Sequence, residues 1–295
     1  MFEWNRVDRA SGDGLAGAVP FTLSHPAAVI PLARGRMVPS ALVVGSMAPD
    51  LPYFFSMGEQ RGATHDPLGI VTIDIALGLA LFAAFHLMWK RPLVALAPAW
   101  ARRKLTGPAN GFRRSMILWV PPSLLVGTVT HVLWDAFTHR RHSFADAMPW
   151  LVTTSVAGLE LYRWLQYGSG LLGVMIIAAW LYRWLRRAPG TREAAPGVSA
   201  RTAAAICGGI LICAIAGGTL GSITLINQPD LPRTIHMTLA SGVIGTICGG
   251  TLALTVYGLA FTLARRRGHR GGSSGRSLPE AGHSASRRDV PAEHS

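Results

Sequence analysis

The stretch Thr130–His139 reads THVLWDAFTH and carries three ionisable side chains in an otherwise apolar segment. His131, Asp135 and His139 are spaced four residues apart, so on a helix they lie along one face. Ionisable groups at membrane depth are costly, and each needs a partner or a function. The stretch therefore predicts a membrane helix with a polar site on one face.

The composition of the whole chain is typical of a membrane protein. The chain has 295 residues, of which 49% are hydrophobic and only 15% are charged, and its mean hydropathy is +0.31. Soluble chains carry charge on about a quarter of their residues. The net charge of +13 comes from basic residues that stand between apolar blocks, where topology-determining charges belong. We therefore expect membrane lipid as a partner and no nucleic acid.

The apolar blocks predict an all-α integral membrane protein, because about twenty apolar residues cross a bilayer as a helix. Five such helices are expected, at residues 70–89, 115–137, 170–185, 203–226 and 239–263. Ahead of them, Ser24 is expected to cap a short amphipathic helix that ends near Leu32. The apolar residues 40–56 are broken by Pro49 and Pro52, so they form either a strained span or a re-entrant piece.

Basic residues indicate the orientation of the chain. They concentrate in residues 90–114, 186–201 and 265–267, and such segments stay in the cytoplasm. The segment 227–236 carries little charge and should face outward. This scheme places the C-terminus in the cytoplasm and the polar end of Thr130–His139 near the outer face.

The last two predicted helices are rich in glycine. Gly217 and Gly221 follow the small-xxx-small spacing that lets helices approach closely, and so do Gly245 and Gly249. Packing between these helices is the simpler interpretation. Pairing between chains, as a homo-oligomer, is the alternative.

His131 and Asp135 lie one helical turn apart, which suits joint binding of one metal ion. His139 lies two turns from His131, about 12 Å along the axis, so it cannot bind the same ion unless the helix ends between them. Otherwise it would bind a second ion or a phosphate, or face water. Imidazole and carboxylate ligands suit zinc and other divalent ions, so the ligand types alone do not name the metal.

Two earlier segments carry similar residues. Asp50 lies between two prolines, and a turn that ends a helix is the alternative to a ligand there. His65, Asp66 and Pro67 either cap the next helix or contribute a ligand. Asp74 is intramembrane, and its expected role is to orient a ligand histidine or to pair with a buried partner.

Four motifs together resemble one family. They are PFTLSHPAA at residues 20–28, GSMAPDLPYF at residues 45–54, Thr64-His65, and the spacing of His131, Asp135 and His139. The chain resembles, over about residues 20–187, an uncharacterised bacterial integral membrane family known as domain of unknown function 4184 (DUF4184). The resemblance implies a multi-pass protein of the bacterial inner membrane.

The order of these motifs is also remotely similar to that of the membrane-bound metal-dependent hydrolases of the YdjM type. This similarity implies a divalent ion such as zinc, held by the candidate ligands His25, Asp50, His65, His131 and Asp135. Asp66, Asp74 and His139 are second-tier candidates. The relatives often have a fuller cluster of acidic residues and histidines after Pro-Asp, where this chain has Leu51-Pro52-Tyr53.

Two hypotheses for function follow. The leading one is a metal-dependent hydrolase that acts at the outer membrane face on a lipid or phosphoester. The alternative is a non-enzymatic transporter or structural component, whose polar residues bind an ion or pair with each other.

The predicted organisation has five parts. They are a disordered extension at 1–19, the family-like membrane domain at 20–187, a cytoplasmic linker at 188–202, two glycine-rich helices at 203–264 and a disordered basic tail at 265–295. The first eighteen residues bear on where the protein starts, because residues 1–18 show no hydrophobic periodicity. The family resemblance predicts a start at Val19, read as the initiator methionine, and a genuine disordered extension is the alternative.

Overall fold

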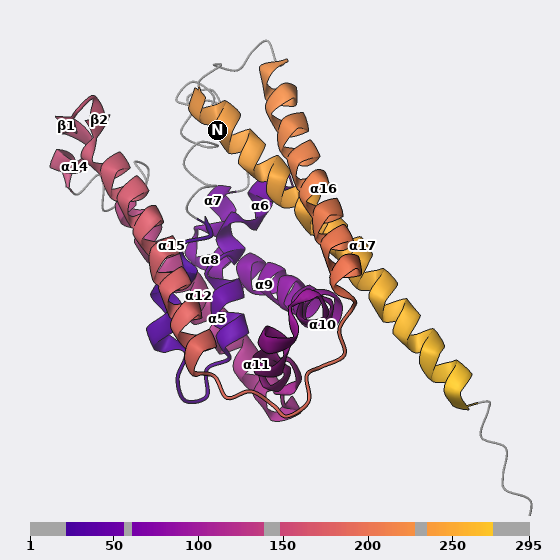
Figure 1. Cartoon of the computed structure of the whole chain (residues 1–295). Coiled ribbons are helices and arrows are strands. Elements are labelled where there is room, and N and C mark those ends of the chain that lie inside the picture. Colours follow the sequence, from indigo (N-terminus) through magenta and orange to yellow (C-terminus); the bar gives the residue numbers. More distant parts are fainter. Residues whose placement is uncertain (1–21, 56–60, 139–147, 228–234, 274–295) are drawn as a thin grey trace, which may run out of the picture.

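The computed structural model describes residues 22–55, 61–138, 148–227 and 235–273, and these are almost entirely helical (Figure 1). Five helices are long and apolar enough to cross a membrane: Pro67–Leu96, Arg114–Thr138, Leu161–Arg187, Ala200–Thr224 and Met237–Arg267. Many of their large apolar side chains are exposed, as expected for helices that face lipid. The predicted all-α fold with five spans is confirmed. The extension predicted at residues 1–18 lies outside the described residues.

The N-terminal part is built from short helices. These are α4 (Pro26–Val29), η1 (Ile30–Leu32), α5 (Pro39–Gly45), η2 (Ala48–Asp50), α6 (Leu51–Phe54) and α7 (Arg61–Thr64). The first five have a proline in their first two positions, where a missing N–H costs nothing. The apolar segment from residue 40 therefore folds as broken helices and not as one straight span. The sequence predicted Ser24 as the cap of α4, but the cap is His25.

The spans follow in chain order. The first comprises α8 (Pro67–Val71), α9 (Ile73–Ala84), the π-helix η4 (Phe85–Trp89) and α10 (Lys90–Leu96), and α11 (Ala99–Asn110) comes after it. The second comprises η5 (Arg114–Trp119) and α12 (Val120–Thr138). The remaining elements are α14 (Pro149–Thr153), the antiparallel strands β1 (Ser155–Val156) and β2 (Leu159–Glu160), α15 (Leu161–Arg187), α16 (Ala200–Ile226) and α17 (Ile235–Ser273).

Two of the predicted boundaries were wrong. Helix α15 begins at Leu161 and not at residue 170, because the residues from Leu161 to Ser169 form its first turns. Helix α17 continues past residue 265 to Ser273, so the beginning of the predicted tail is helical.

A close crossing of α5 and α12 forms the centre of the fold. A Cβ atom at Gly127 would lie 2.3 Å from the carbonyl oxygen of Leu42, and one at Gly45 would lie 2.2 Å from that of Leu124. Only glycine fits at these two positions, because a methyl group would overlap the opposite backbone. The crossing brings the end of α5 beside the face of α12 that carries His131.

The glycine-rich faces of α16 and α17 pack against each other within the chain. A Cβ atom at Gly217 would lie 2.2 Å from the carbonyl oxygen of Gly245. This agrees with the simpler interpretation of the small-xxx-small spacing, and the homo-oligomer stays a prediction. Helix α17 also contacts the first span, where Trp89 Nε1 donates to Thr255 Oγ1 at 3.0 Å.

The basic segments gather at one end of the molecule, which is the lower end in Figure 1. Residues 188–199 run along α11, since Thr191 N donates to Arg103 O at 3.0 Å and Ala195 N donates to Thr106 Oγ1 at 2.9 Å. Helices α6 and α7 lie toward the opposite end. Basic loops that are distant in sequence therefore lie together.

We expect Gly127→Ala to lower the free energy of unfolding by about 1–3 kcal/mol, because the added methyl group would overlap the backbone of α5. Gly208→Ala is the matched control. A Cβ atom at Gly208 meets nothing within 4 Å, and alanine favours a helix over glycine. Thermal unfolding of the purified proteins in detergent measures both effects. Equal melting temperatures for the two variants would contradict the close crossing.

Candidate metal centre

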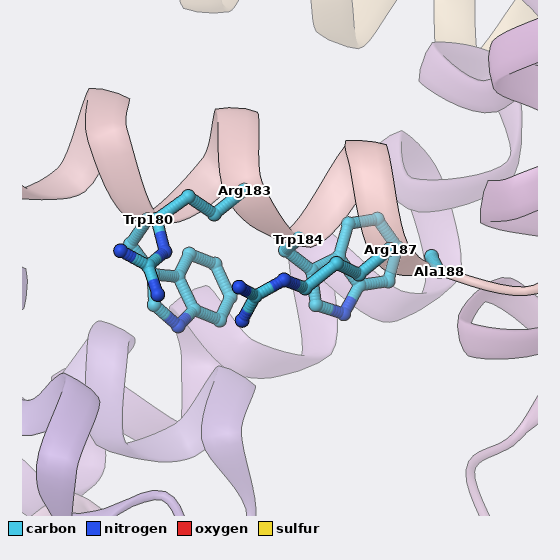
Figure 2. Close-up of a pocket in the computed structure, with 5 residues that line it drawn as sticks. All are labelled: Trp180, Arg183, Trp184, Arg187 and Ala188. Carbon is cyan, nitrogen blue, oxygen red and sulfur yellow. The ribbon is translucent and has the colours of Figure 1, made fainter.

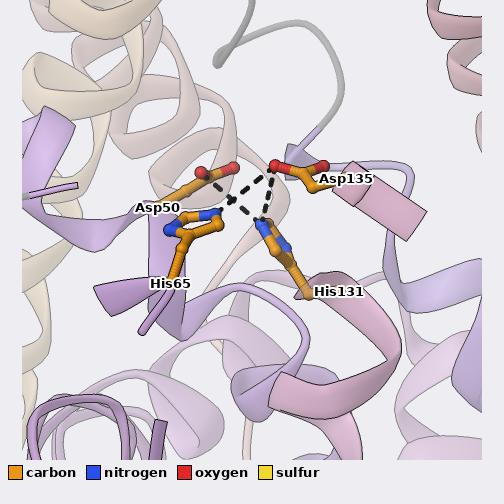
Figure 3. A group of neighbouring side chains, drawn as sticks. All are labelled: Asp50, His65, His131 and Asp135. Carbon is orange, nitrogen blue, oxygen red and sulfur yellow. Dashed lines mark ion pairs between the residues drawn. The ribbon is translucent and has the colours of Figure 1, made fainter. Parts of the chain in front are cut away.

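Four side chains from three separate segments converge between the helices (Figure 3). Asp50 ends η2, His65 follows α7, and His131 and Asp135 lie one turn apart on α12. One ligand atom from each residue lies within 4.8 Å of the others. The structure thus brings together the segments that the sequence predicted to meet. That these residues bind a metal stays a prediction.

Three distances between ligand atoms are close to those expected around a common ion. His131 Nε2 lies 3.6 Å from Asp50 Oδ1 and 3.5 Å from Asp135 Oδ2. His65 Nε2 lies 3.4 Å from the same Asp135 oxygen. A tetrahedral ion with bonds of about 2.0–2.1 Å holds its ligand atoms about 3.3–3.4 Å apart. Hydrogen bonds between nitrogen and oxygen are shorter, at about 2.7–3.2 Å.

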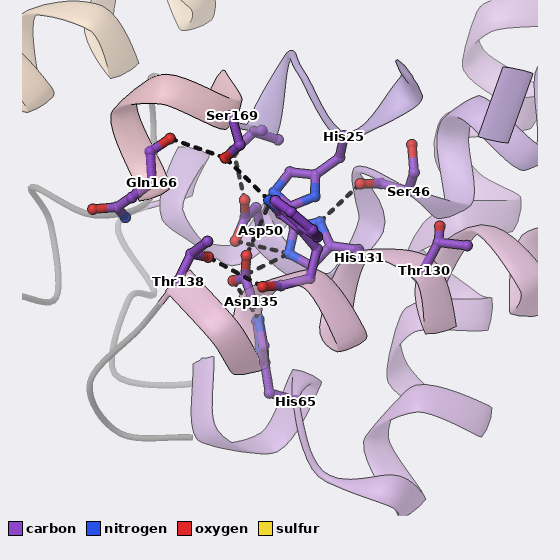
Figure 4. A network of polar contacts seen from close by, with 12 residues as sticks. His25, Ser46, Asp50, His65, Thr130, His131, Asp135, Thr138, Gln166 and Ser169 are labelled. Atoms are coloured by element: carbon purple, nitrogen blue, oxygen red, sulfur yellow. Dashed lines mark hydrogen bonds and ion pairs between the residues drawn. The ribbon is translucent and has the colours of Figure 1, made fainter. Parts of the chain in front are cut away.

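Hydrogen bonds behind the two rings determine which nitrogen faces the centre (Figure 4). His131 Nδ1 lies 2.8 Å from Ser46 O, and a carbonyl oxygen only accepts, so Nδ1 is the donor. Thr64 Oγ1 donates to Pro49 O at 2.9 Å, so the same hydroxyl accepts from His65 Nδ1 at 3.1 Å. When these rings are neutral, as metal ligands are, the lone pair is therefore on Nε2, which is the atom that faces the carboxylates.

The carboxylates are oriented as well. Thr22 Oγ1 donates to Asp50 Oδ2 at 2.5 Å, which leaves Oδ1 toward the centre. Asp135 directs Oδ2 into the centre, and its Oδ1 lies 3.5 Å from His25 Nε2. Metal ligands are commonly held in this way by outer partners.

Burial makes the charge of the centre costly. His131 is 0% exposed, and Asp50 and Asp135 are each 2% exposed. Two ionised carboxylates in such a place need compensating positive charge. A divalent cation would supply that charge and would bind the Nε2 lone pairs of neutral histidines, so the residues fit such an ion.

His25 lies beside the centre but outside the group of four ligand atoms. Its ring stacks on that of His131 with centroids 3.9 Å apart. Helix α15 comes close here, since a Cβ atom at Gly173 would lie 2.8 Å from Ser24 Cβ. The Nε2 atom of His25 lies 3.5 Å from Asp135 Oδ1, the oxygen that points away from the centre. Its predicted role as a ligand stays a prediction.

Two of the second-tier candidates, Asp66 and Asp74, do not belong to this group. Asp66 is exposed and caps α8, where its side chain accepts from Leu68 N at 3.1 Å, as the capping alternative predicted. Asp74 on α9 is 0% exposed, and neither of its carboxylate oxygens has a hydrogen-bond partner among the described residues. It interacts electrostatically with His131. His139 lies outside the described residues.

Sequence analysis missed the groups that orient the ligands. Thr22 and Thr64 both stand inside the motifs that carry the family resemblance, and their place there was the one available signal. Ser46 contributes a backbone carbonyl. Because any residue type would supply this oxygen, no sequence pattern could have indicated it.

Comparison with protein families supports the motif-based resemblance. The family model described as Domain of unknown function (DUF4184) matches residues 19–259. The match contains all four residues of the candidate metal centre and also reaches beyond residue 187, through most of the two glycine-rich helices. Neither the curated proteins nor the solved structures gave a match, so the remote similarity to YdjM-type hydrolases stays a prediction. The chain belongs to the DUF4184 family of domains of unknown function.

Proposed function

We propose that Asp50, His65, His131 and Asp135 hold one divalent metal ion. The observation that carries this proposal is that two histidine Nε2 atoms lie 3.4–3.6 Å from carboxylate oxygens of Asp50 and Asp135 in a buried site, farther apart than hydrogen-bonded atoms. Two imidazoles and two carboxylates suit zinc, and they also suit similar divalent ions. Zinc or a similar ion is therefore the expected cofactor.

The proposed reaction is hydrolysis of a lipid or another phosphoester. A bound divalent ion would activate water and polarise the substrate. His25 lies beside Asp135 and outside the ligand group, so its imidazole is placed to accept or return a proton. A location between membrane-spanning helices favours a substrate that is dissolved in the bilayer.

A structural ion site is the second candidate. Four protein ligands complete a tetrahedral shell, and structural zinc sites are closed in this way, whereas catalytic sites keep a position open. All four side chains are at most 3% exposed. In this case the ion would tie η2 and the start of the first span to α12, without catalysis.

The proposed location is the inner membrane of a bacterium, with the basic end of the molecule in the cytoplasm. The docking of residues 188–199 on α11 supports this, because two basic segments then lie at the same end of the molecule. Such segments resist translocation. The C-terminus would then lie in the cytoplasm, and the metal centre would lie toward the outer face.

Washed, purified wild-type protein should retain about one divalent ion per chain, because four ligands in a buried site bind tightly. His131→Ala should lose this ion, since it removes a ligand whose orientation Ser46 fixes. Elemental analysis by mass spectrometry measures the ion content of each protein.

Two other histidine variants serve as controls. His86→Ala removes an intramembrane histidine that bonds Ser40 Oγ at 3.0 Å, away from the centre, and should keep the ion. His25→Ala should keep it too. A wild-type protein without metal, or with no more than His131→Ala, would refute the metal centre. Loss of the ion in His25→Ala would make His25 a fifth ligand.

Chelation distinguishes the two candidate functions. We expect the metal-loaded protein to hydrolyse phosphoester lipids, to stop when the ion is chelated, and to recover when zinc is added. The His131→Ala protein should show no hydrolysis after zinc is added. Mass spectrometry of the released products measures the reaction. A metal-loaded protein that cleaves no member of a lipid and phosphoester panel, but unfolds several degrees lower after chelation, would favour the structural site.

Topology can be tested with single cysteines in a chain that lacks Cys207, Cys213 and Cys248. Ser155→Cys in the exposed hairpin should react with a membrane-impermeant maleimide in intact cells, whereas Glu193→Cys should react only after permeabilisation. The opposite pattern would reverse the proposed orientation and place the centre toward the cytoplasmic face.

A further inference from the structure

The last two turns of α15 form an open pocket. Its volume is about 460 Å³, and it is lined by Trp180, Arg183, Trp184, Arg187 and Ala188. Figure 2 shows the two indole rings and the two guanidinium groups on one side of the helix. Spacings of three and four residues produce this grouping, since such positions share a helix face.

The two guanidinium groups of the pocket are available for a ligand. Within the described part of the chain, no hydrogen bond or ion pair engages Arg183 or Arg187, and both residues are exposed. Arg186, on the same turn, is engaged. Its Nη1 lies 3.1 Å from the hydroxyl oxygen of Tyr182, and its guanidinium lies 5.7 Å from the centre of that ring. The pocket therefore offers a ligand two guanidinium groups that start about one helical turn apart.

The neighbouring helix α11 makes this end of α15 suitable for an anion. The last carbonyls of a helix carry partial negative charge, which repels anions. Lys104 Nζ donates to the carbonyl oxygens of Leu185 and Arg186. Its ammonium group offsets that charge and adds a third cation near the pocket.

We propose that this pocket binds the phosphate of an anionic phospholipid. Arginine binds phosphate oxygens through paired N–H donors, and basic pockets at the ends of membrane helices bind anionic headgroups. Helix α15 is a candidate span that ends at Arg187, so the pocket lies at headgroup depth. Trp180 is 45% exposed, and with Trp184 it offers apolar surface to the glycerol and the first acyl carbons. A free phosphate ion could not use this surface, which is why the proposal names a lipid.

The test measures lipid binding by the full chain in detergent. The protein is incubated with equal amounts of phosphatidylglycerol and phosphatidylcholine, and native mass spectrometry counts each bound lipid. Wild type should prefer phosphatidylglycerol. Arg183→Gln and Arg187→Gln should each lower that preference about fivefold. Arg186→Gln is the matched control, because it removes the same charge from the same turn and should leave the preference almost unchanged.

Three outcomes would overturn the proposal. The first is equal binding of both lipids by wild type, and the second is a loss of preference in Arg186→Gln as large as in the other variants, which would indicate a general effect of charge. In a third arm, inorganic phosphate is added as a competitor. Displacement of phosphatidylglycerol by millimolar phosphate would assign the pocket to the free ion. All three arginines lie on the surface, so the variants should fold. Their melting temperatures check this.

Discussion

Two carboxylates and two histidines are enclosed between apolar helices. The negative charge of the carboxylates must be balanced there by protonated histidines or by a bound cation. Asp50 and Asp135 are almost fully buried, as is His131. In a membrane, the helices around them supply no water to share this charge. The surrounding structure therefore has to fix every donor and acceptor. It does so with the carbonyl of Ser46 and the hydroxyls of Thr22 and Thr64.

The broken helices of the N-terminal part help to satisfy this requirement. A helix that ends inside the protein leaves carbonyl oxygens without intrahelical partners. The carbonyl of Ser46, at the end of α5, accepts from His131, and the carbonyl of Pro49 accepts from Thr64. Each break between helices thus helps to orient a histidine of the centre, His131 directly and His65 through Thr64. Gly45 and Gly127 make this possible, because they bring the end of α5 against α12.

Much of this arrangement could be predicted from sequence, but only where a local pattern carried it. Five apolar blocks gave the spans, and the four-residue spacing put His131 and Asp135 on one face. Asp50 and His65 each had a plausible local role, so only their coincidence in one family pattern pointed to the centre. The start of α15 was placed too late, because Arg163, Gln166 and Ser169 stand ahead of its apolar block. Neither the glycine crossing nor the stacking of His25 on His131 follows from a local pattern, since both depend on how distant helices pack.

The short helices also determine when the centre can form during synthesis. None of α4, α5, η2 and α6 is long enough to enter a bilayer by itself as a span. The bond between Ser46 and His131 joins residues that are 85 positions apart. The N-terminal segment therefore leaves the ribosome long before its partners on α12, and it must wait at the membrane surface or beside the insertion machinery. Assembly of the centre is consequently a late step that follows insertion of the second span, and a chain interrupted before that point cannot complete it.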